Sequence, residues 1–320
     1  MHFFRIFLHH LDISPKLLWE STSYFGDNPR LCFRAARSVK EFEATKNDAR
    51  SEITAAAEEK GNLLQLLHAS RRGGSAVSHT IFVISPTNEE RRLTQCAFGA
   101  VSRWAFDLLL EHYETQQADA AATFYVTISR ISEAASLWGD VFEKLVLNHL
   151  DGIRGEEFSI RGLTSTEPMT WTYRGPPQRL NFQWDSEFID EITKAVEGET
   201  PLHLVPLSRN FAAVDSIMYD PNEALTCIRV TVGKEHDILV SGLQRIQSWL
   251  KQGTKLEGLR PSEKRPWRFI FVVPSGMESF ELQQLKGDTA KGEWAGKVHQ
   301  YVSVLDAVGK RITNVVQANS

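Results

Sequence analysis

An acidic residue inside an apolar run is the first feature of this chain that could do chemistry. Asp215 lies in FAAVDSIMY, residues 211–219, which has the composition of a β-strand. A carboxylate buried in such a strand requires a cationic partner or a metal ion. Arg229 and Thr231 lie two apart on the next apolar run, residues 225–232, so they share a strand face. If the two runs pair, Asp215 is a metal ligand, the ion-pair partner of Arg229, or a strand-end residue that caps a turn.

Three more polar residues flank these runs. Glu143 lies in a helical pattern that precedes the strands, and Lys234 and His236 follow the second run. Each also has an ordinary interpretation: Glu143 as a solvated helix residue, His236 as a histidine at the entry to the next helix. The sequence therefore predicts a small polar functional site. The alternative is an ion pair between Asp215 and Arg229 that only stabilises the fold.

Missing motifs and composition exclude several classes of protein. The chain has no GxxxxGK[ST] phosphate loop, no GxGxxG, no HExxH, no paired CxxC and no GxSxG. We therefore expect no self-sufficient ATPase, dehydrogenase, zincin or α/β-hydrolase. The net charge of −4 excludes a uniformly basic nucleic-acid binder. No run is long enough for a membrane helix, and residues 1–10 do not resemble a signal peptide.

One local cluster is basic: Arg260, Lys264, Arg265 and Arg268 surround Trp267. It predicts either a phosphate-contacting patch in which Trp267 stacks on a base, or a solvated loop. The three cysteines are widely spaced among apolar neighbours, which indicates buried thiols in a reducing compartment.

Periodicity predicts the elements that position these residues. Helical spacing occurs over residues 38–68, 88–110, 128–150 and 238–250, with a short helix near 188–196. Strand patterns occur at residues 79–85, 158–163, 203–207, 211–219, 225–232, 267–273 and 301–305.

The turn residues Asp220, Pro221 and Asn222 predict that residues 211–219 and 225–232 form an antiparallel hairpin. The fold expected is α/β: a mainly helical region over residues 1–125, then a domain over 126–320 with an open mixed sheet flanked by helices. Residues 164–200, which contain three prolines, are expected to form an insertion in that domain.

Three segments carry a resemblance: LWGDVFEKLVLNHL (137–150), PLSRNFAAVDSIMYDP (206–221) and CIRVTVGKEHDILVSGLQRIQSWL (227–250). Together they resemble the restriction-endonuclease-like, PD-(D/E)xK-type carboxyl-terminal domain of the crinkler and retrotransposon-hot-spot-like proteins. Upstream, YFGDNPRLCFRAA (24–36) and HTIFVISP (79–86) are similar to the tail of the AAA-like nucleotide triphosphatase domain that precedes it. In this resemblance Arg30 corresponds to a sensor arginine, without the phosphate loop that would hold a nucleotide.

The resemblance implies roles for the polar site. Glu143 matches the helix acid, Asp215 the metal-binding aspartate, and His236 the histidine after the second hairpin strand. In active members the acids hold Mg²⁺ and a lysine activates the attacking water. This chain instead has Arg229 where an acid or glutamine stands, and Thr231 two residues later, where lysine or threonine stands.

Arg229 is expected to compete with Mg²⁺ for the carboxylates, and Lys234 is the candidate substitute for the lysine. The function expected is therefore a nucleic-acid-acting or nucleic-acid-binding protein, nuclear or cytoplasmic, with weak or absent cleavage and Mg²⁺ as its cofactor. Neither ATP nor a membrane is expected as a partner. The alternatives are a non-catalytic, effector-like or protein-interaction scaffold and a gene fragment without activity. For the location, secretion into a host cell stays open, although no signal peptide is seen.

Overall fold

The structure, a computed structural model, describes residues 13–26, 28–60, 78–86, 96–116, 124–130, 134–151, 157–164, 168–172, 179–207, 211, 213–223, 225–287 and 291–306. The chain divides into two compact units, the first within residues 1–141 together with 315–320 and the second within residues 142–314. This division comes later in the chain than the predicted boundary near residue 125. Each unit is described by itself.

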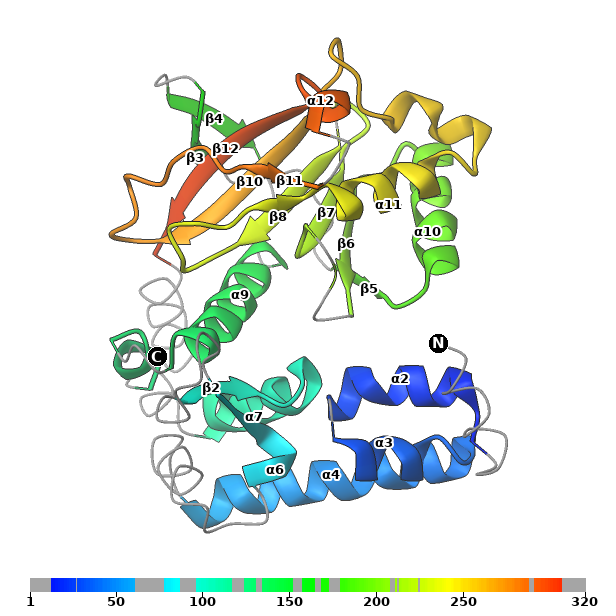
Figure 1. Ribbon diagram of the computed structural model, residues 1–320, viewed down its shortest axis with the longest axis vertical. Helices are drawn as coiled ribbons and strands as arrows, with labels where there is room; N and C mark the ends of the chain where they lie inside the picture. The colour runs from blue at the N-terminus through cyan, green and yellow to red at the C-terminus, as the bar shows by residue number, and fades with distance from the viewer. Residues whose placement is uncertain are drawn as a thin grey trace. The chain divides into compact units, whose positions relative to one another are not determined.

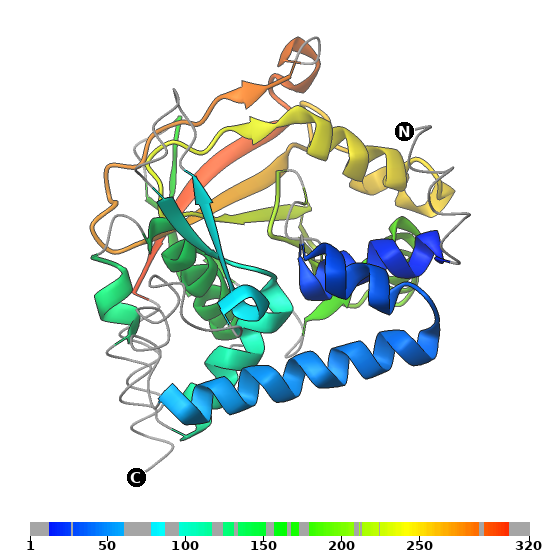
Figure 2. The ribbon, with the colours of Figure 1, turned by 60° about the horizontal axis from the view of Figure 1, so that its bottom comes forward.

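The first unit is mainly helical, as predicted. Its elements are α2 (Pro15–Phe25), α3 (Pro29–Ala35), α4 (Val39–Lys60), α6 (Ser78–Ile81), β1 (Phe82–Pro86), β2 (Cys96–Ala100) and α7 (Arg103–Gln116). Two of the helices begin with a side-chain cap and a proline: Ser14 accepts from the backbone N–H of Leu17 before α2, and Asn28 from that of Leu31 before α3. Helices α2 and α3 lie beside the long helix α4 (Figures 1 and 2).

An aromatic cluster holds these helices together. Phe25 and Phe42 are buried, and Tyr24 and Trp104 pack against them with ring centroids 5.4–6.4 Å apart. Gly26 ends α2 at a φ of 57°, where an added Cβ would lie 1.9 Å from the carbonyl oxygen of Val101. Only glycine fits this close approach, which joins the end of α2 to the residues before α7.

Two predictions for this unit need correction. The predicted strand at 79–85 begins with the short helix α6 and becomes extended only from Phe82. The predicted helix at 88–110 is wrong over residues 96–100, which form β2 antiparallel to β1, and α7 starts at Arg103. The run CAFGA is short and apolar, and periodicity alone does not distinguish helix from strand in such a run. Residues 87–95 lie outside the described residues.

The second unit is built on a mixed sheet of eight strands. Their order across the sheet is β4 (Pro168–Thr172), β3 (Glu157–Gly162), β12 (Val298–Leu305), β10 (Trp267–Pro274), β8 (Thr226–Val230), β7 (Ser216–Tyr219), β6 (Leu202–Pro206) and β5 (Leu180–Phe182). The unit is completed by helices α10 (Asp185–Glu197), α11 (Val240–Leu250) and α12 (Lys291–Trp294), the 3₁₀ helix η2 (Thr254–Leu259) and the two-stranded pair β9 (Ile238–Leu239) and β11 (Leu285–Lys286). The division between the units falls within helix α9 (Ala135–Asp151), whose residues from 142 onward belong to the second unit. The α/β fold class is as predicted (Figure 1).

The central strands set the geometry of the site. Strands β6, β7 and β8 form an antiparallel meander, and β10 then pairs parallel to β8 after α11. The predicted hairpin is confirmed, with Ser216 opposite Ile228. Its first strand is shorter than predicted, because the backbone of Ala213 adopts a φ of 83°, outside the strand region. Asp215 therefore lies where the chain enters β7, and its N–H still donates to the carbonyl of Ile228 at 2.9 Å.

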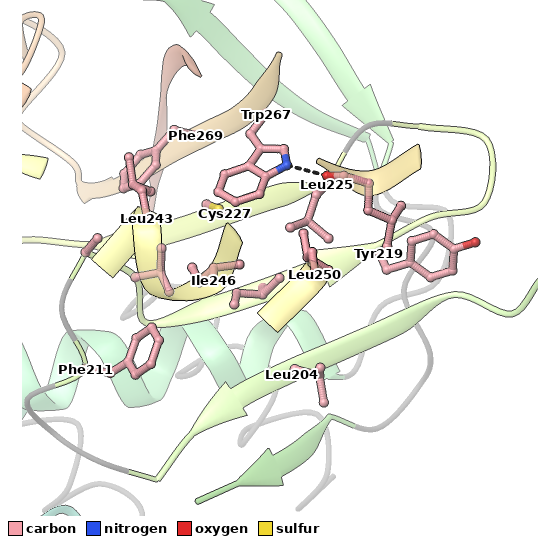
Figure 3. Packing of buried hydrophobic residues seen from close by; sticks show 14 of the residues in the cluster. Leu204, Phe211, Tyr219, Leu225, Cys227, Leu243, Ile246, Leu250, Trp267 and Phe269 are labelled. Carbon is pink, nitrogen blue, oxygen red and sulfur yellow. Dashed lines mark hydrogen bonds between the residues drawn. The ribbon is translucent and has the colours of Figure 1, made fainter. Parts of the chain in front are cut away.

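Helix α11 covers one face of this sheet. Leu243, Ile246 and Leu250 are fully buried, and Figure 3 shows them over the side chains of β8 and β10. Each buried leucine or isoleucine contributes about 1.5–3 kcal/mol relative to an exposed one. The predicted helix at 238–250 is confirmed from Val240, after the two residues of β9.

The expected insertion at 164–200 is part of the sheet. It supplies both edge strands, β4 and β5, and the amphipathic helix α10, which starts at Asp185 and includes the predicted residues 188–196. Among the described residues, no helix combines the length and the apolar character that a membrane span requires.

Candidate functional site

Asp215 and Arg229 form the centre of the candidate site. Arg229 Nη1 donates to Oδ1 of Asp215 at 2.7 Å, and the backbone N–H of Val230 donates to Oδ2 at 2.7 Å. The side chain of Asp215 is 11% exposed and that of Arg229 is 21% exposed. The hairpin register produces this contact, because Asp215 precedes Ser216, the residue opposite Ile228. The ion pair considered from the sequence is thus formed, and both carboxylate oxygens accept a hydrogen bond.

His236 holds the other side of the same guanidinium. Arg229 Nε donates to His236 Nε2 at 2.6 Å. Burial lowers the pKa of His236 to about 4; the charge of Arg229 lowers it further and that of Asp237 opposes the shift. The ring is neutral at pH 7, and its single proton must lie on Nδ1, because Nε2 accepts the bond from Arg229. We call Asp215, Arg229 and His236 the arginine cluster.

The arginine cluster does not fit a divalent metal ion. Mg²⁺ takes oxygen ligands in octahedral geometry, whereas Oδ1 of Asp215 is bonded to a guanidinium and Oδ2 to a backbone amide. A metal ion bound to this carboxylate would also lie beside the charge of Arg229. Within the described ranges, no group of three or more His, Cys, Asp or Glu residues is arranged to hold a metal ion.

Three other residues predicted for the site lie in different settings. Thr231 is buried, and its hydroxyl accepts from the N–H of Gly233 at 3.1 Å, so it shapes the turn after β8. Lys234 is exposed in the same turn. Glu143 lies in α9 and is partly buried. Its approach to Asp215 stays a prediction.

The basic cluster before β10 has structural partners. Trp267 is 1% exposed and its indole N–H donates to the carbonyl of Leu259 at 2.7 Å (Figure 3). The expectation that Trp267 stacks on a base is therefore wrong, because its ring packs in the core under η2. Arg268 pairs with Glu223.

The other cations of this cluster lie in the loop before β10. Arg265 donates to the carbonyls of Gly258 and Glu223 at 2.6 and 3.2 Å, although much of its surface is exposed. Arg260 lies 3.7 Å from a carboxylate oxygen of Glu257, and Lys264 is exposed. Contact of this surface with phosphates stays a prediction.

Two further titratable groups lie inside the sheet. Burial lowers the pKa of His203, on β6, to about 3, and the charge of Arg179 adds to the shift. Burial raises the pKa of the Cys227 thiol, on β8, to about 12. Cys227 and Cys32 are both buried, as predicted; the side chain of Cys96 lies outside the description.

Two glutamines that no sequence motif marks support this site. Gln283 accepts a hydrogen bond from the backbone N–H of His236, and Gln300 bonds in turn to the backbone of Gln283. Glutamine in a polar loop and glutamine in the middle of a strand carry no motif or periodicity that marks them as functional. Arg30, assigned by resemblance, is exposed in the first turn of α3.

In a comparison with known proteins, no family model, curated protein or solved structure matches the chain.

Proposed function

We propose that this protein is of PD-(D/E)xK nuclease-like type and acts on or binds nucleic acid, with metal-dependent cleavage weak or absent. The observation that carries the proposal is the 2.7 Å contact between Arg229 and Asp215. It puts a fixed positive charge on the carboxylate that the resemblance assigns to metal binding. A nuclear or cytoplasmic location goes with such a function.

The order of elements supports the fold part of this proposal. Helix α9 precedes the meander of β6, β7 and β8, and α11 then connects β8 to the parallel strand β10. Apart from the expected insertion between the first strand and the hairpin, this is the order of helix, strand, hairpin, helix and strand that the sequence predicts. Asp215 lies at the start of the second meander strand and Arg229 near the end of the third.

The arrangement of side chains supports the low activity. Cleavage of a phosphodiester requires charge to be stabilised on the phosphate and a water molecule to be activated. Arg229 can supply charge, but two of its nitrogens already donate to Asp215 and His236. His236 Nε2 accepts from Arg229, so this nitrogen cannot take a proton from water while that bond holds. Lys234 is exposed, on the turn beyond β8.

A combined cleavage and binding assay tests this function. Wild-type protein and the Arg229→Gln and Asp215→Ala variants are incubated with plasmid DNA and with RNA, with Mg²⁺, Mn²⁺ or EDTA, beside binding titrations at several salt concentrations. We expect salt-sensitive binding by the wild type with little cleavage. Arg229→Gln should raise Mn²⁺ affinity and any cleavage, and Asp215→Ala should abolish both metal binding and cleavage. Efficient Mg²⁺-dependent cleavage by the wild type that Arg229→Gln leaves unchanged would contradict the proposal.

A second candidate is a protein-interaction scaffold without nucleic-acid binding. The partners of the basic cluster favour it: Arg268 is neutralised by Glu223, Arg265 donates to backbone carbonyls, and Trp267 is buried. The net charge of −4 also disfavours association with a polyanion. In the same assay, the absence of both cleavage and binding would favour the scaffold.

A further inference from the structure

A segment between β10 and α12 ties down the turn that carries His236. We call residues 275–287 the strap. Its end, β11, pairs parallel with β9, and the N–H of Ile238 donates to the carbonyl of Gln284 at 2.9 Å. Lys286 of the strap forms an ion pair with Asp237. The strap is therefore bonded to the chain immediately after His236.

The side chain of Gln283 extends this pairing as if it were a peptide group. Its Oε1 accepts from the N–H of His236 at 2.5 Å, and its Nε2 donates to the carbonyl of Lys234 at 3.2 Å. In a parallel sheet, one residue accepts a hydrogen bond from an N–H on the neighbouring strand and donates to the carbonyl two positions earlier on that strand. The side-chain amide of Gln283 makes the same two bonds. A second bond from Nε2, to the carbonyl of Glu281 at 2.8 Å, fixes the amide within the strap. The backbone of His236 is thus held by a side chain.

Gln300 attaches the strap to the main sheet in the same way. Its Oε1 accepts from the N–H of Gln283 at 3.0 Å and its Nε2 donates to the carbonyl of Gln283 at 2.9 Å. Gln300 lies on β12, opposite Phe269 of β10, and Gln283 and Gln300 are 7% and 8% exposed. Buried amides whose bonds are all formed with backbone groups have few alternative arrangements. The path from the sheet to His236 is therefore stiff.

From these contacts we propose that Gln283 and Gln300 are positioning residues for the arginine cluster. They fix the backbone of His236, and the imidazole of His236 fixes the guanidinium of Arg229 against Asp215. The strap then determines whether the carboxylate of Asp215 is held by Arg229 or open to another cation. This inference rests on the proposed function, in which the arginine cluster occupies the place of the metal site.

The test measures the arginine cluster directly in the full-length chain by NMR. One readout is the exchange rate of the Arg229 Nε–H proton, and the other is the ring tautomer of His236, read from its ¹⁵N shifts at pH 7. The variant is Gln283→Met, and the matched control is Gln284→Met, a neighbouring glutamine whose side chain is exposed. Thermal melting of each variant reports on the fold separately.

We expect Gln283→Met to speed exchange of the Arg229 Nε–H proton at least tenfold and to mix the two neutral tautomers of His236. Gln284→Met should match the wild type in both readouts. If Gln283→Met is folded and leaves exchange and tautomer unchanged, the proposal is overturned. If it does not fold, Gln300→Met takes its place, with the same loss expected and the same overturning result.

The wild type alone gives a further test that requires no variant. If the strap positions the arginine cluster, the backbone N–H of His236 and the Nε–H of Arg229 should exchange through a common opening, so the ratio of intrinsic to observed exchange rate should agree within about threefold for the two protons. A ratio many times smaller for Arg229 Nε–H than for His236 N–H would refute the proposal. These readouts involve neither nucleic acid nor metal, so efficient cleavage by the wild type would refute the proposed function without deciding this one.

Discussion

Replacing Arg229 by methionine removes the cation from Asp215 and keeps a long, unbranched side chain in the same space. Asp215 then keeps the hydrogen bond from the N–H of Val230, and its side chain is 11% exposed. His236 also loses the donor to its Nε2. The carboxylate of Asp215 would then carry its charge in a poorly solvated position, without the guanidinium that balances it in the wild type.

The size of the loss follows from the burial of the pair. Removing one partner from a fully buried ion pair costs about 3–5 kcal/mol. Because Arg229 is 21% exposed, solvent screens part of this, and we expect a loss of about 2–4 kcal/mol in the free energy of unfolding. Asp215→Asn should cost less, since an amide oxygen still accepts from Val230. The double variant should be only about 1 kcal/mol less stable than the wild type, a coupling energy of about 2 kcal/mol.

Denaturant unfolding of the four proteins at pH 7.5 measures this coupling, followed by circular dichroism and tryptophan fluorescence. A repeat at high salt should change the coupling little, because salt screens a buried pair less than an exposed one. If the two single losses simply add, Asp215 and Arg229 do not stabilise each other, which would refute a coupled ion pair in the arginine cluster.

Two further predictions concern stability. Burial lowers the folded-state pKa values of His203 and His236 to about 3 and about 4. Both histidines therefore contribute their full stabilisation above pH 6.5, and the free energy of unfolding falls as the pH drops toward these pKa values. From pH 7.5 to pH 5, His203 accounts for a loss of about 2 kcal/mol and the partly exposed His236 for less. Unfolding free energies at a series of pH values check this, and no decrease below pH 6.5 would contradict it. Gly26→Ala should lower the free energy of unfolding of the first unit by more than about 2 kcal/mol, the sum expected for a strained backbone and an overpacked side chain. The added Cβ would lie 1.9 Å from the carbonyl oxygen of Val101. Gly276→Ala is the control, with a φ of 93° but open space around its Cβ, so equal losses in the two variants would show that backbone strain alone is responsible.

The central elements could be predicted because their signals were local. The hairpin of β7 and β8 follows from two apolar runs and the turn at Asp220, and α11 from helical spacing of leucine, isoleucine and tryptophan. The contact of Arg229 with Asp215 followed from that hairpin and the alternation of strand faces. In each case residues close in sequence determined the result.

What escaped prediction depends on residues far apart in the sequence. Strands β4 and β5 are only five and three residues long, with no clear alternation of apolar and polar residues, and they are strands because β3 and β6 offer them partners. Trp267 looked like an exposed aromatic residue among cations, yet η2 buries it. Gln283 and Gln300 acquire their roles from the strap and β12, and nothing in their neighbouring residues indicates this.

The order of strands in the eight-stranded sheet imposes a limit on its shape. Strands β4 and β5 follow each other in the chain but form its opposite edges. Seven spacings of about 4.8 Å would separate the edges of a flat sheet by roughly 34 Å. The chain from Thr172 to Leu180, the last residue of β4 and the first of β5, reaches at most about 29 Å when fully extended. Twist alone does not shorten the line across the strands, so the sheet cannot be flat, and its two edge strands must lie closer to each other than the strand count alone would place them.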